Sequence, residues 1–291
     1  MLGILSLKDG RTLQWADNGI DSDSALIFHH GTTIALDVWQ SWLDDAASHN
    51  KRAIAVNRPG IGQSSRFQGR RIIDDVSDTR ELLEHLKIKS FVSIGWSGGG
   101  ARALGTGLIQ GCIAVHTIAG ISPINFDDAE SITWLSPERG SKIENFLQDF
   151  GAILEDRRIQ YEEDLAVTHE SLLEIISGLP NFELHHDRYL KFSHDLFNAI
   201  APTLVNGPET DCDDYLANIS SWGFTLLEVN VPVTLWHGEI DEDVVLDRGK
   251  FLNSQLPQSK LNTFDDQGHV TIVLEKRDEI LTAAIQALEN I

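Results

Sequence analysis

The chain has 291 residues, of which 42% are apolar, and it carries 44 Asp and Glu against 23 Lys and Arg, a net charge of −21. This length is sufficient to bury a core, and the charge disfavours binding to nucleic-acid phosphates or anionic membrane surfaces. No apolar run approaches the ~18 residues of a membrane span, and the apolar start reaches the charged Lys8 too soon for a signal peptide. The two cysteines, Cys112 and Cys212, form neither a disulfide framework nor a zinc site. We therefore expect a soluble, cytoplasmic globular protein.

Short apolar segments alternate with helical patterns over the first 120 residues. An Asp9-Gly10 turn precedes Thr12–Trp15 and predicts an N-terminal hairpin. Continuous apolar strands indicate a parallel sheet covered by helices on both faces, built from βαβ units. Apolar residues spaced by three and four over 72–86 predict a helix against that sheet. The predicted strands are 25–28, 53–56, 91–94 and 113–118.

The strand signal disappears over residues 121–225, where the apolar spacing is helical. Strands return at 233–236 and 261–264, and one final helix is predicted over 272–288. We therefore predict a core domain formed by 1–120 and 226–291, with a helical cap formed by 121–225.

The predicted cap contains 20 acidic and 6 basic residues, a net charge of −14 out of the −21 of the chain. This asymmetry has two interpretations. One is a solvated helical surface that maintains solubility; the other is a negative field at the mouth of a cleft. The second predicts a small-molecule substrate that is neutral or cationic.

The segment from Ile94 to Gly100 (IGWSGGG) follows an apolar strand and precedes a helical start. Gly-x-Ser-x-Gly in this context is the pattern of a nucleophile elbow, in which a strained turn exposes the serine and requires small residues two places on either side. Gly95 and Gly99 supply them around Ser97. The helix start behind the serine favours a developing anion. No lysine follows, as a Walker A loop requires, and the glycine spacing does not match the dinucleotide motif.

A serine hydroxyl needs a base and an orienting acid to act as a nucleophile. Asp241 follows the strand at 233–236, and His269 follows the strand at 261–264. Both belong to loops at strand ends, where parallel sheets bind their ligands, and the order is Ser, Asp, His. The loop after the strand at 25–28 contains Thr32, whose N–H, together with that of Gly98, is expected to form an oxyanion hole.

These motifs, taken together, resemble those of lid-bearing α/β-hydrolases over nearly the whole chain. His30-Gly31 is similar to the family's oxyanion motif, and Asn57 to Ser64 (NRPGIGQS) is similar to its Asp-Arg-Pro-Gly-x-Gly-x-Ser loop, with Asn in place of Asp. Trp236 to Asp241 and Gly268-His269 resemble its acid and base loops. The resemblance implies an α/β fold with a mostly parallel eight-stranded sheet, helices on both faces and a helical cap inserted after strand six.

Other residues compete for the same roles. Some members of the family place the acid after strand six, where Asp127 and Asp128 stand in this chain. His237 and His30 are interpreted as structural. The run 185–187 (HHD) suggests a metal, but no second ligand group at zinc spacing accompanies it, so a solvated helix is favoured and no metal site is predicted.

The resulting hypothesis is a serine hydrolase that cleaves a carboxylic ester without a cofactor. Trp96 and Thr33 are predicted to contact the substrate. The alternatives are a proline iminopeptidase-like aminopeptidase, a cofactor-free perhydrolase and a small-molecule receptor on the same fold. The sequence leaves the oligomeric state open.

Overall fold

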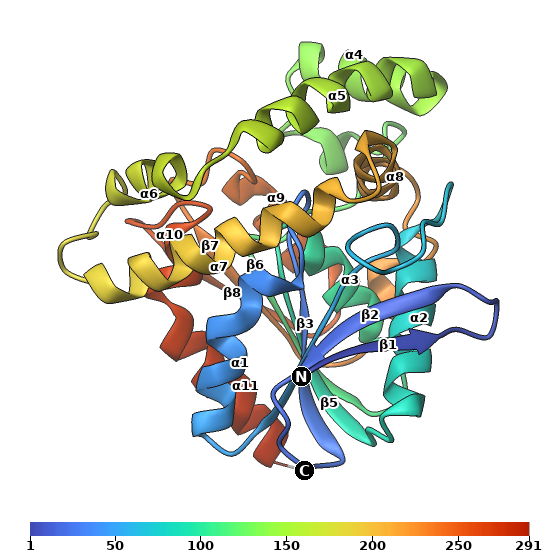
Figure 1. The fold of residues 1–291 in the computed structure, drawn as a ribbon. Helices are drawn as coiled ribbons and strands as arrows, with labels where there is room; N and C mark the ends of the chain where they lie inside the picture. The colour runs from blue at the N-terminus through green and yellow to red at the C-terminus, as the bar shows by residue number, and fades with distance from the viewer. Residues whose placement is uncertain (291) are drawn as a thin grey trace.

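The computed structural model, which describes residues 1–290, contains one eight-stranded sheet in the order β1-β2-β4-β3-β5-β6-β7-β8 (Figure 1). The strands are β1 Leu2–Ser6, β2 Thr12–Asp17, β3 Ser24–His29, β4 Arg52–Val56, β5 Ser90–Trp96, β6 Cys112–Ile118, β7 Val233–Gly238 and β8 Ser259–Phe264.

The sheet is antiparallel at one edge and parallel elsewhere. The pairs β1–β2 and β2–β4 are antiparallel, and β1 and β2 form the predicted hairpin. Every pair from β4 to β8 is parallel. The carboxyl ends of β3, β5, β6, β7 and β8 therefore meet at one edge of the sheet. This arrangement confirms the predicted fold class.

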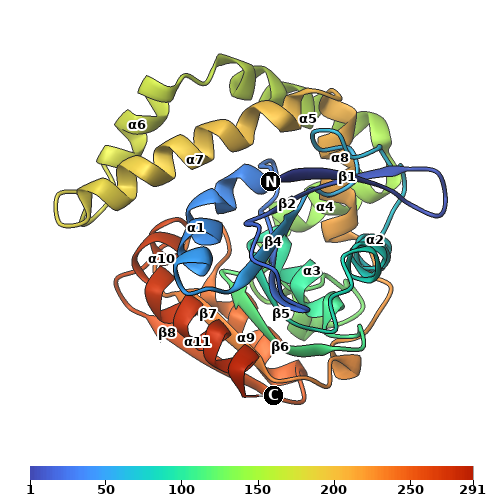
Figure 2. The same cartoon turned by 60° about the horizontal axis from the view of Figure 1, so that its bottom comes forward.

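Helices cover both faces of the sheet (Figure 2). Successive residues of a strand point to opposite faces. In β3, Leu26 and Phe28 belong to one buried cluster and Ala25 and Ile27 to the other. The first cluster packs against α1 Gln40–Ser48 and α11 Arg277–Glu289. The second packs against α2 Ile72–His85, α3 Gly98–Thr106 and α9 Leu246–Gln255.

The prediction of a single C-terminal helix over 272–288 is wrong. The structure contains α10 Thr271–Glu275 and, after a break at Lys276 (φ −95°, ψ 7°), α11. Beyond the break the buried Arg277 donates to the carbonyl of Ser41 at the start of α1. The break thus coincides with a tertiary anchor, which apolar spacing alone does not reveal.

The chain between β6 and β7 is helical, as predicted from its spacing. Its elements are η2 Ala129–Ile132, α4 Pro137–Gln148, α5 Phe150–Ala166, α6 His169–Ser177, α7 His186–Leu204, α8 Pro208–Ile219 and η3 Leu226–Glu228. The sequence predicted helical structure over 121–225 but did not identify α8. This omission matters because α8 supplies several residues of the site described below.

These helices pack in two ways. Residues of α4, α5 and α8, among them Phe146 and Ile153, form a small cluster of their own. Residues of α6 and α7, among them Leu172 and Tyr189, belong instead to the cluster that covers one face of the sheet. Figure 1 shows α4 and α5 standing away from the sheet and α7 lying closer to α1. No helix within residues 1–290 is long and apolar enough to cross a membrane.

Tyr189 links the inserted helices to the C-terminal part of the core. Its ring is fully buried, and its hydroxyl oxygen lies 2.7 Å from both the carbonyl of Pro180 and Oε1 of Glu275, which share its one proton as acceptors. The link spans 86 residues of sequence.

Substitution Tyr189→Phe is expected to lower the free energy of unfolding by about 1–2 kcal/mol, because the hydroxyl is lost while the ring stays buried. Urea unfolding followed by tryptophan fluorescence measures it. The matched control is Tyr215→Phe, whose hydroxyl makes no hydrogen bond among the described residues and whose loss is expected to cost less than ~0.5 kcal/mol. Equal effects of the two substitutions would contradict the proposed link.

Candidate active site

Ser97 occupies a strained turn between β5 and α3. Its backbone has φ 54° and ψ −121°, a conformation that residues with a side chain rarely adopt. A Cβ added to Gly95 would collide with the carbonyl of Gly99, and one added to Gly99 would collide with the carbonyl of His29. Both glycines are therefore required by the close approach of backbone to backbone. The turn has the strand–turn–helix geometry of a nucleophile elbow.

His269 and Asp241 are hydrogen-bonded to each other. His269 Nδ1 lies 2.9 Å from Asp241 Oδ2. Asp241 is 4% exposed, and its Oδ1 accepts the backbone N–H of Val244 at 2.8 Å and of Asp243 at 3.0 Å. These donors fix the carboxylate, which in turn fixes the imidazole with Nδ1 as its donor and leaves Nε2 free to accept a proton.

Ser97 and His269 line the same cavity, which has a volume of about 340 Å³. The structure shows no hydrogen bond between the serine hydroxyl and the imidazole among residues 1–290. Contacts of this kind are commonly long before a substrate binds. The tertiary fold thus brings to one cavity two side chains that are 172 positions apart in the sequence.

Trp96 packs beside His269 and not on the cavity wall. Its indole N–H donates to the carbonyl of His269 at 3.1 Å, and the two rings lie 5.4 Å apart. The ring of Phe192 contacts it on another side, and Trp96 is 5% exposed. The structure therefore gives Trp96 a position that supports the imidazole, whereas the sequence led us to predict a substrate contact.

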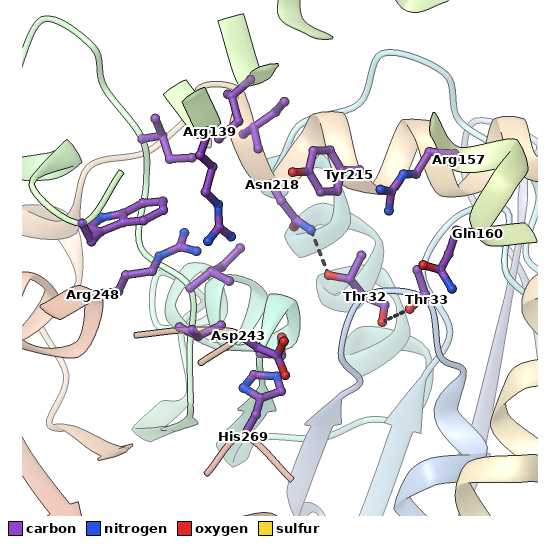
Figure 3. A pocket seen from close by; sticks show the side chains of 17 residues that line it. Thr32, Thr33, Arg139, Arg157, Gln160, Tyr215, Asn218, Asp243, Arg248 and His269 are labelled. Carbon is purple, nitrogen blue, oxygen red and sulfur yellow. Dashed lines mark hydrogen bonds between the residues drawn. The ribbon is translucent and has the colours of Figure 1, made fainter. Parts of the chain in front are cut away.

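The loop after β3 places Thr32 and Thr33 on the cavity wall, facing the residues labelled in Figure 3. Thr32 Oγ1 accepts the side-chain N–H of Asn218 at 3.0 Å, and the Thr33 hydroxyl donates to the Thr32 carbonyl at 2.7 Å. A Cβ added to Gly98 would lie 3.4 Å from the backbone nitrogen of Thr32. The two backbone segments predicted to form an oxyanion hole are therefore neighbours beside Ser97.

His30 shapes this loop, as interpreted from the sequence. It is fully buried, its Nδ1 lies 2.9 Å from the Gly31 carbonyl, and its Nε2 accepts the Arg58 backbone N–H at 3.3 Å. Burial, and secondly the charge of Arg58, lower the pKa of His30 well below its ordinary value. A neutral ring with its proton on Nδ1 satisfies both contacts.

Arg58 holds the same loop by hydrogen bonds to its backbone and connects that loop to α8. Its Nη1 donates to the His30 carbonyl at 2.5 Å and its Nη2 to the Gly31 carbonyl at 2.8 Å. Its Nε and Nη2 also bind both carboxylate oxygens of Asp214, each at 2.7 Å. The loop that carries Thr32 is therefore held by a residue of the inserted helices.

Asp214 is the centre of a buried ionic network. It is 1% exposed and also accepts from Arg70 at 2.6 Å and from Arg102 at 3.2 Å, while Asp75 pairs with the same two arginines. Burial alone raises the pKa of Asp214, but the charges of Arg58, Arg102 and Arg70 outweigh burial and hold the pKa well below its usual range. Asp214 is thus an anion in the folded protein at neutral pH.

Sequence reasoning missed both Asp214 and Asn218. They belong to α8, 156 and 186 residues from Arg58 and Thr32 respectively. No motif surrounds them. Their only sequence signal is the Pro208 that starts the helix after Gly207, because proline at the first helical position is typical of a helix start.

The other residues considered for the acid and base roles do not contact His269 or Asp241 through a hydrogen bond. Asp127 and Asp128 are exposed, and Asp128 accepts the N–H of Glu130 at the start of η2. His237 is buried and bonds the carbonyl of Val244 at 2.7 Å. Neither aspartate reaches His269, so Asp241 is the carboxylate that orients it.

The run 185–187 does not gather metal-ligating side chains within the part of the chain that the structure describes. His186 contacts its neighbour Asp187 at 3.3 Å on the surface. The side chains of His, Cys, Asp and Glu that do converge are Asp241, Asp243 and His269. Two of those three are already bonded to each other.

The whole cavity wall combines the elbow, the loop after β3 and the inserted helices. It includes residues of α4, α5 and α8 as well as the loop after β7. The lining residues are Thr32, Thr33, Ser97, Ile121, Ile124, Trp134, Arg139, Ile143, Arg157, Gln160, Tyr215, Asn218, Ile219, Asp243, Val244, Arg248 and His269.

Comparison with known proteins defines the class. The family model of the alpha/beta hydrolase fold matches residues 24–276, so the chain belongs to that family. The esterase EaEST from Exiguobacterium antarcticum superimposes with a TM-score of 0.70 at 17% identity, covering 99% of this chain and 100% of that chain. A bromoperoxidase from Bacillus anthracis gives 0.70 at 18% identity, with the same coverage.

Curated relatives resemble shorter parts of the chain. A non-heme chloroperoxidase from Streptomyces lividans is 31% identical over 102 residues, which is 35% of this chain and 37% of that protein. The bifunctional esterase/perhydrolase DCH from Acinetobacter calcoaceticus is 27% identical over the same length and the same shares. These matches span about a third of each relative. Together, the family model and the solved structures place the chain in the α/β-hydrolase fold family.

Substitution Asp214→Asn is expected to lower the free energy of unfolding by about 3–5 kcal/mol at neutral pH, because it leaves buried guanidinium groups uncompensated. Since the folded pKa of Asp214 lies below the unfolded value of about 3.9, its stabilisation is complete at neutral pH and is lost as pH falls below about 4. The difference in the free energy of unfolding between wild type and Asp214→Asn should therefore become smaller below about pH 4. Urea unfolding at several pH values measures it.

The matched control is Asp213→Asn on the same helix. Asp213 pairs with Arg66, whose side chain is 35% exposed, so the released charge reaches solvent and the loss should be smaller. Equal losses at the two positions would show that the Asp214 network is not the anchor.

Proposed function

We propose that this hydrolase cleaves small carboxylic esters with Ser97 as nucleophile, His269 as general base and Asp241 as the residue that orients the base. The observation that carries the proposal is the 2.9 Å bond between His269 and Asp241 at the cavity that also contains the strained Ser97. A serine on such a turn, with an oriented imidazole at the same cavity, is the arrangement used for acyl transfer.

In the first half-reaction, His269 Nε2 takes the proton of the Ser97 hydroxyl while the oxygen attacks the carbonyl carbon of the ester. The carbonyl oxygen becomes an anion. The N–H groups of Gly98 and Thr32 donate to it, supported by the start of α3. The imidazolium then gives its proton to the alcohol, which leaves, and the acyl group stays on Ser97.

In the second half-reaction, His269 takes a proton from water, whose oxygen attacks the acyl carbon. The imidazolium returns that proton to Ser97 as the carboxylic acid leaves. Asp241 remains ionised throughout and stabilises the imidazolium at both stages. The balance is one ester and one water consumed, one acid and one alcohol formed.

The inserted helices supply the walls that would hold the substrate. We propose that residues 121–225 act as a cap, because Arg139, Arg157 and Tyr215 come from these helices and face the cavity (Figure 3). A cavity of about 340 Å³ lies at the small end of the usual range of ~300–1,000 Å³ and suits a small molecule. Thr33, on the opposite wall, is proposed to contact the substrate.

An aminopeptidase is supported less well than an esterase. Binding the ammonium group of a peptide requires carboxylates in the cavity, and the described wall has one, Asp243. Three arginines share that wall.

Substitution Ser97→Ala is expected to lower kcat for 4-nitrophenyl esters by ~10³–10⁶-fold, because the nucleophile is removed. A fluorophosphonate is expected to label the wild-type protein at Ser97, as shown by peptide mapping. The control is Ser77→Ala, an exposed serine on α2 whose loss should leave turnover and labelling unchanged. Labelling at another residue, or full turnover without the Ser97 hydroxyl, would disprove the mechanism. Ligand-dependent thermal stabilisation without any turnover would favour a receptor.

A second candidate is perhydrolysis at the same site, favoured by the resemblance to the esterase/perhydrolase DCH. Hydrogen peroxide would replace water in the second half-reaction and release a peracid, with the same proton transfers through His269. Incubation with acetate and peroxide, with bromide oxidation as the readout, tests it. Activity that disappears in Ser97→Ala supports perhydrolysis; no activity in a preparation that hydrolyses esters rejects it.

A further inference from the structure

The cavity wall carries more positive than negative side chains. Three arginines, Arg139, Arg157 and Arg248, face it together with a single acid, Asp243 (Figure 3). Arg157 is already neutralised, because it pairs with Asp156 and lies 3.7 Å from Asp211. The other two arginines have no carboxylate within 4.0 Å among residues 1–290.

Within residues 1–290, Arg248 is a buried cation without an anionic partner. The residue is 6% exposed on α9, its Nε donates to the Ser122 hydroxyl at 3.2 Å, and its Nη2 donates to the Ser122 carbonyl at 2.7 Å. Its Nη1 makes no hydrogen bond within the described chain. Burial, and secondly the charge of Arg139, lower its pKa to about 9, so the side chain is still a cation at neutral pH.

Trp134 places the two arginines together. The guanidinium carbon of Arg248 lies 4.1 Å from the ring centroid of Trp134, and that of Arg139 lies 5.5 Å from it. Figure 3 shows both guanidinium groups extending toward the same part of the cavity. For the buried Arg248, a cation–π contact contributes only ~1–2 kcal/mol, which is small beside the cost of burying an unpaired ion. The geometry is that of a site for an anion.

We propose that Arg248 and Arg139 bind a carboxylate of the substrate, so that the esters cleaved at Ser97 carry a free carboxylate. The inference rests on the proposed ester hydrolysis and names its substrate class. Guanidinium groups bind carboxylates through paired N–H···O bonds. Nη1 of Arg248 and the guanidinium of Arg139 provide donors for the two oxygens. Asp243 does not compete, because it lies with His269 and Asp241.

The substrate proposed here is an anion, whereas the sequence led us to expect a neutral or cationic substrate. That expectation used the net charge of residues 121–225, which is −14. The acids responsible are distributed over the helices, and none of them lines the cavity. A substrate inside the cavity meets the local arginines at short range, while distant exposed acids are screened by salt.

The kinetic test compares the mono-4-nitrophenyl ester of adipic acid with the same compound whose free carboxylate is methylated. Wild type is expected to show a higher kcat/KM for the anionic ester, chiefly through KM. Arg248→Gln and Arg139→Gln should each lower the ratio of the two kcat/KM values by ~10–100-fold, because a charge-assisted hydrogen bond is lost. Arg139 is exposed, so its variant tests the proposal even if Arg248→Gln fails to fold.

The matched control is Arg158→Gln on α5. Arg158 is exposed and does not line the cavity, so the same change of charge should leave the ratio unchanged. A ratio that falls equally in this variant would indicate a general electrostatic effect and overturn the assignment.

A binding test separates the subsite from the chemistry. Ser97→Ala is titrated by calorimetry with adipate, with adipamide and with inorganic phosphate. Binding of adipate but not of adipamide or phosphate, weakened in Ser97→Ala/Arg139→Gln, supports the subsite. If this binding is observed but wild type hydrolyses no ester, the proposed function fails and the subsite stands. Ester hydrolysis without charge preference, and without adipate binding, overturns the subsite alone. Tighter binding of phosphate would overturn the choice of a carboxylate.

Discussion

The parallel order of β3, β5, β7 and β8 is the constraint on which the site depends. Parallel strands end at one edge of the sheet, so the loops that follow them converge although the sequence separates them widely. Ser97, Thr32, Asp241 and His269 each follow one of these strands, so the proposed nucleophile, oxyanion donor, acid and base lie close together. The two buried faces of the sheet fix the strands and therefore the relative positions of the loops.

A second constraint comes from α8. Asp214 joins Arg58, Arg70 and Arg102 in the interior, and Arg58 holds the carbonyls of the loop that carries Thr32. A buried ion pair contributes little net stability, because desolvation offsets its attraction, but it defines one geometry and penalises others. The inserted helices are thereby tied to the loop that carries Thr32, so their position would affect both the proposed oxyanion hole and the proposed substrate binding.

The cavity shows that the charge of a protein and the charge of its binding site are separate quantities. The chain is strongly acidic, yet the wall above Ser97 has two arginines without a carboxylate partner in the part of the chain that the structure describes. Long-range repulsion of an anion by surface acids is screened over ~8–10 Å at physiological salt. The buried guanidinium of Arg248 is screened much less. In the proposed carboxylate site, local donors would therefore decide which ligand stays bound, and net charge would mainly modify the rate of approach.

The sequence by itself determined the sheet, the elbow and the order of Ser97, Asp241 and His269, because these depend on local signals: apolar runs of strand length, glycines at a strained turn, and polar residues directly after strands. Only the tertiary structure decided the break at Lys276, the partners Asp214 and Asn218, and the arginines that face the cavity. These depend on how helices distant in sequence pack against one another. Apolar periodicity shows which face of a helix is buried, but not which partner that face meets. Arg248 resembles any arginine of an amphipathic helix until the fold buries it without a carboxylate.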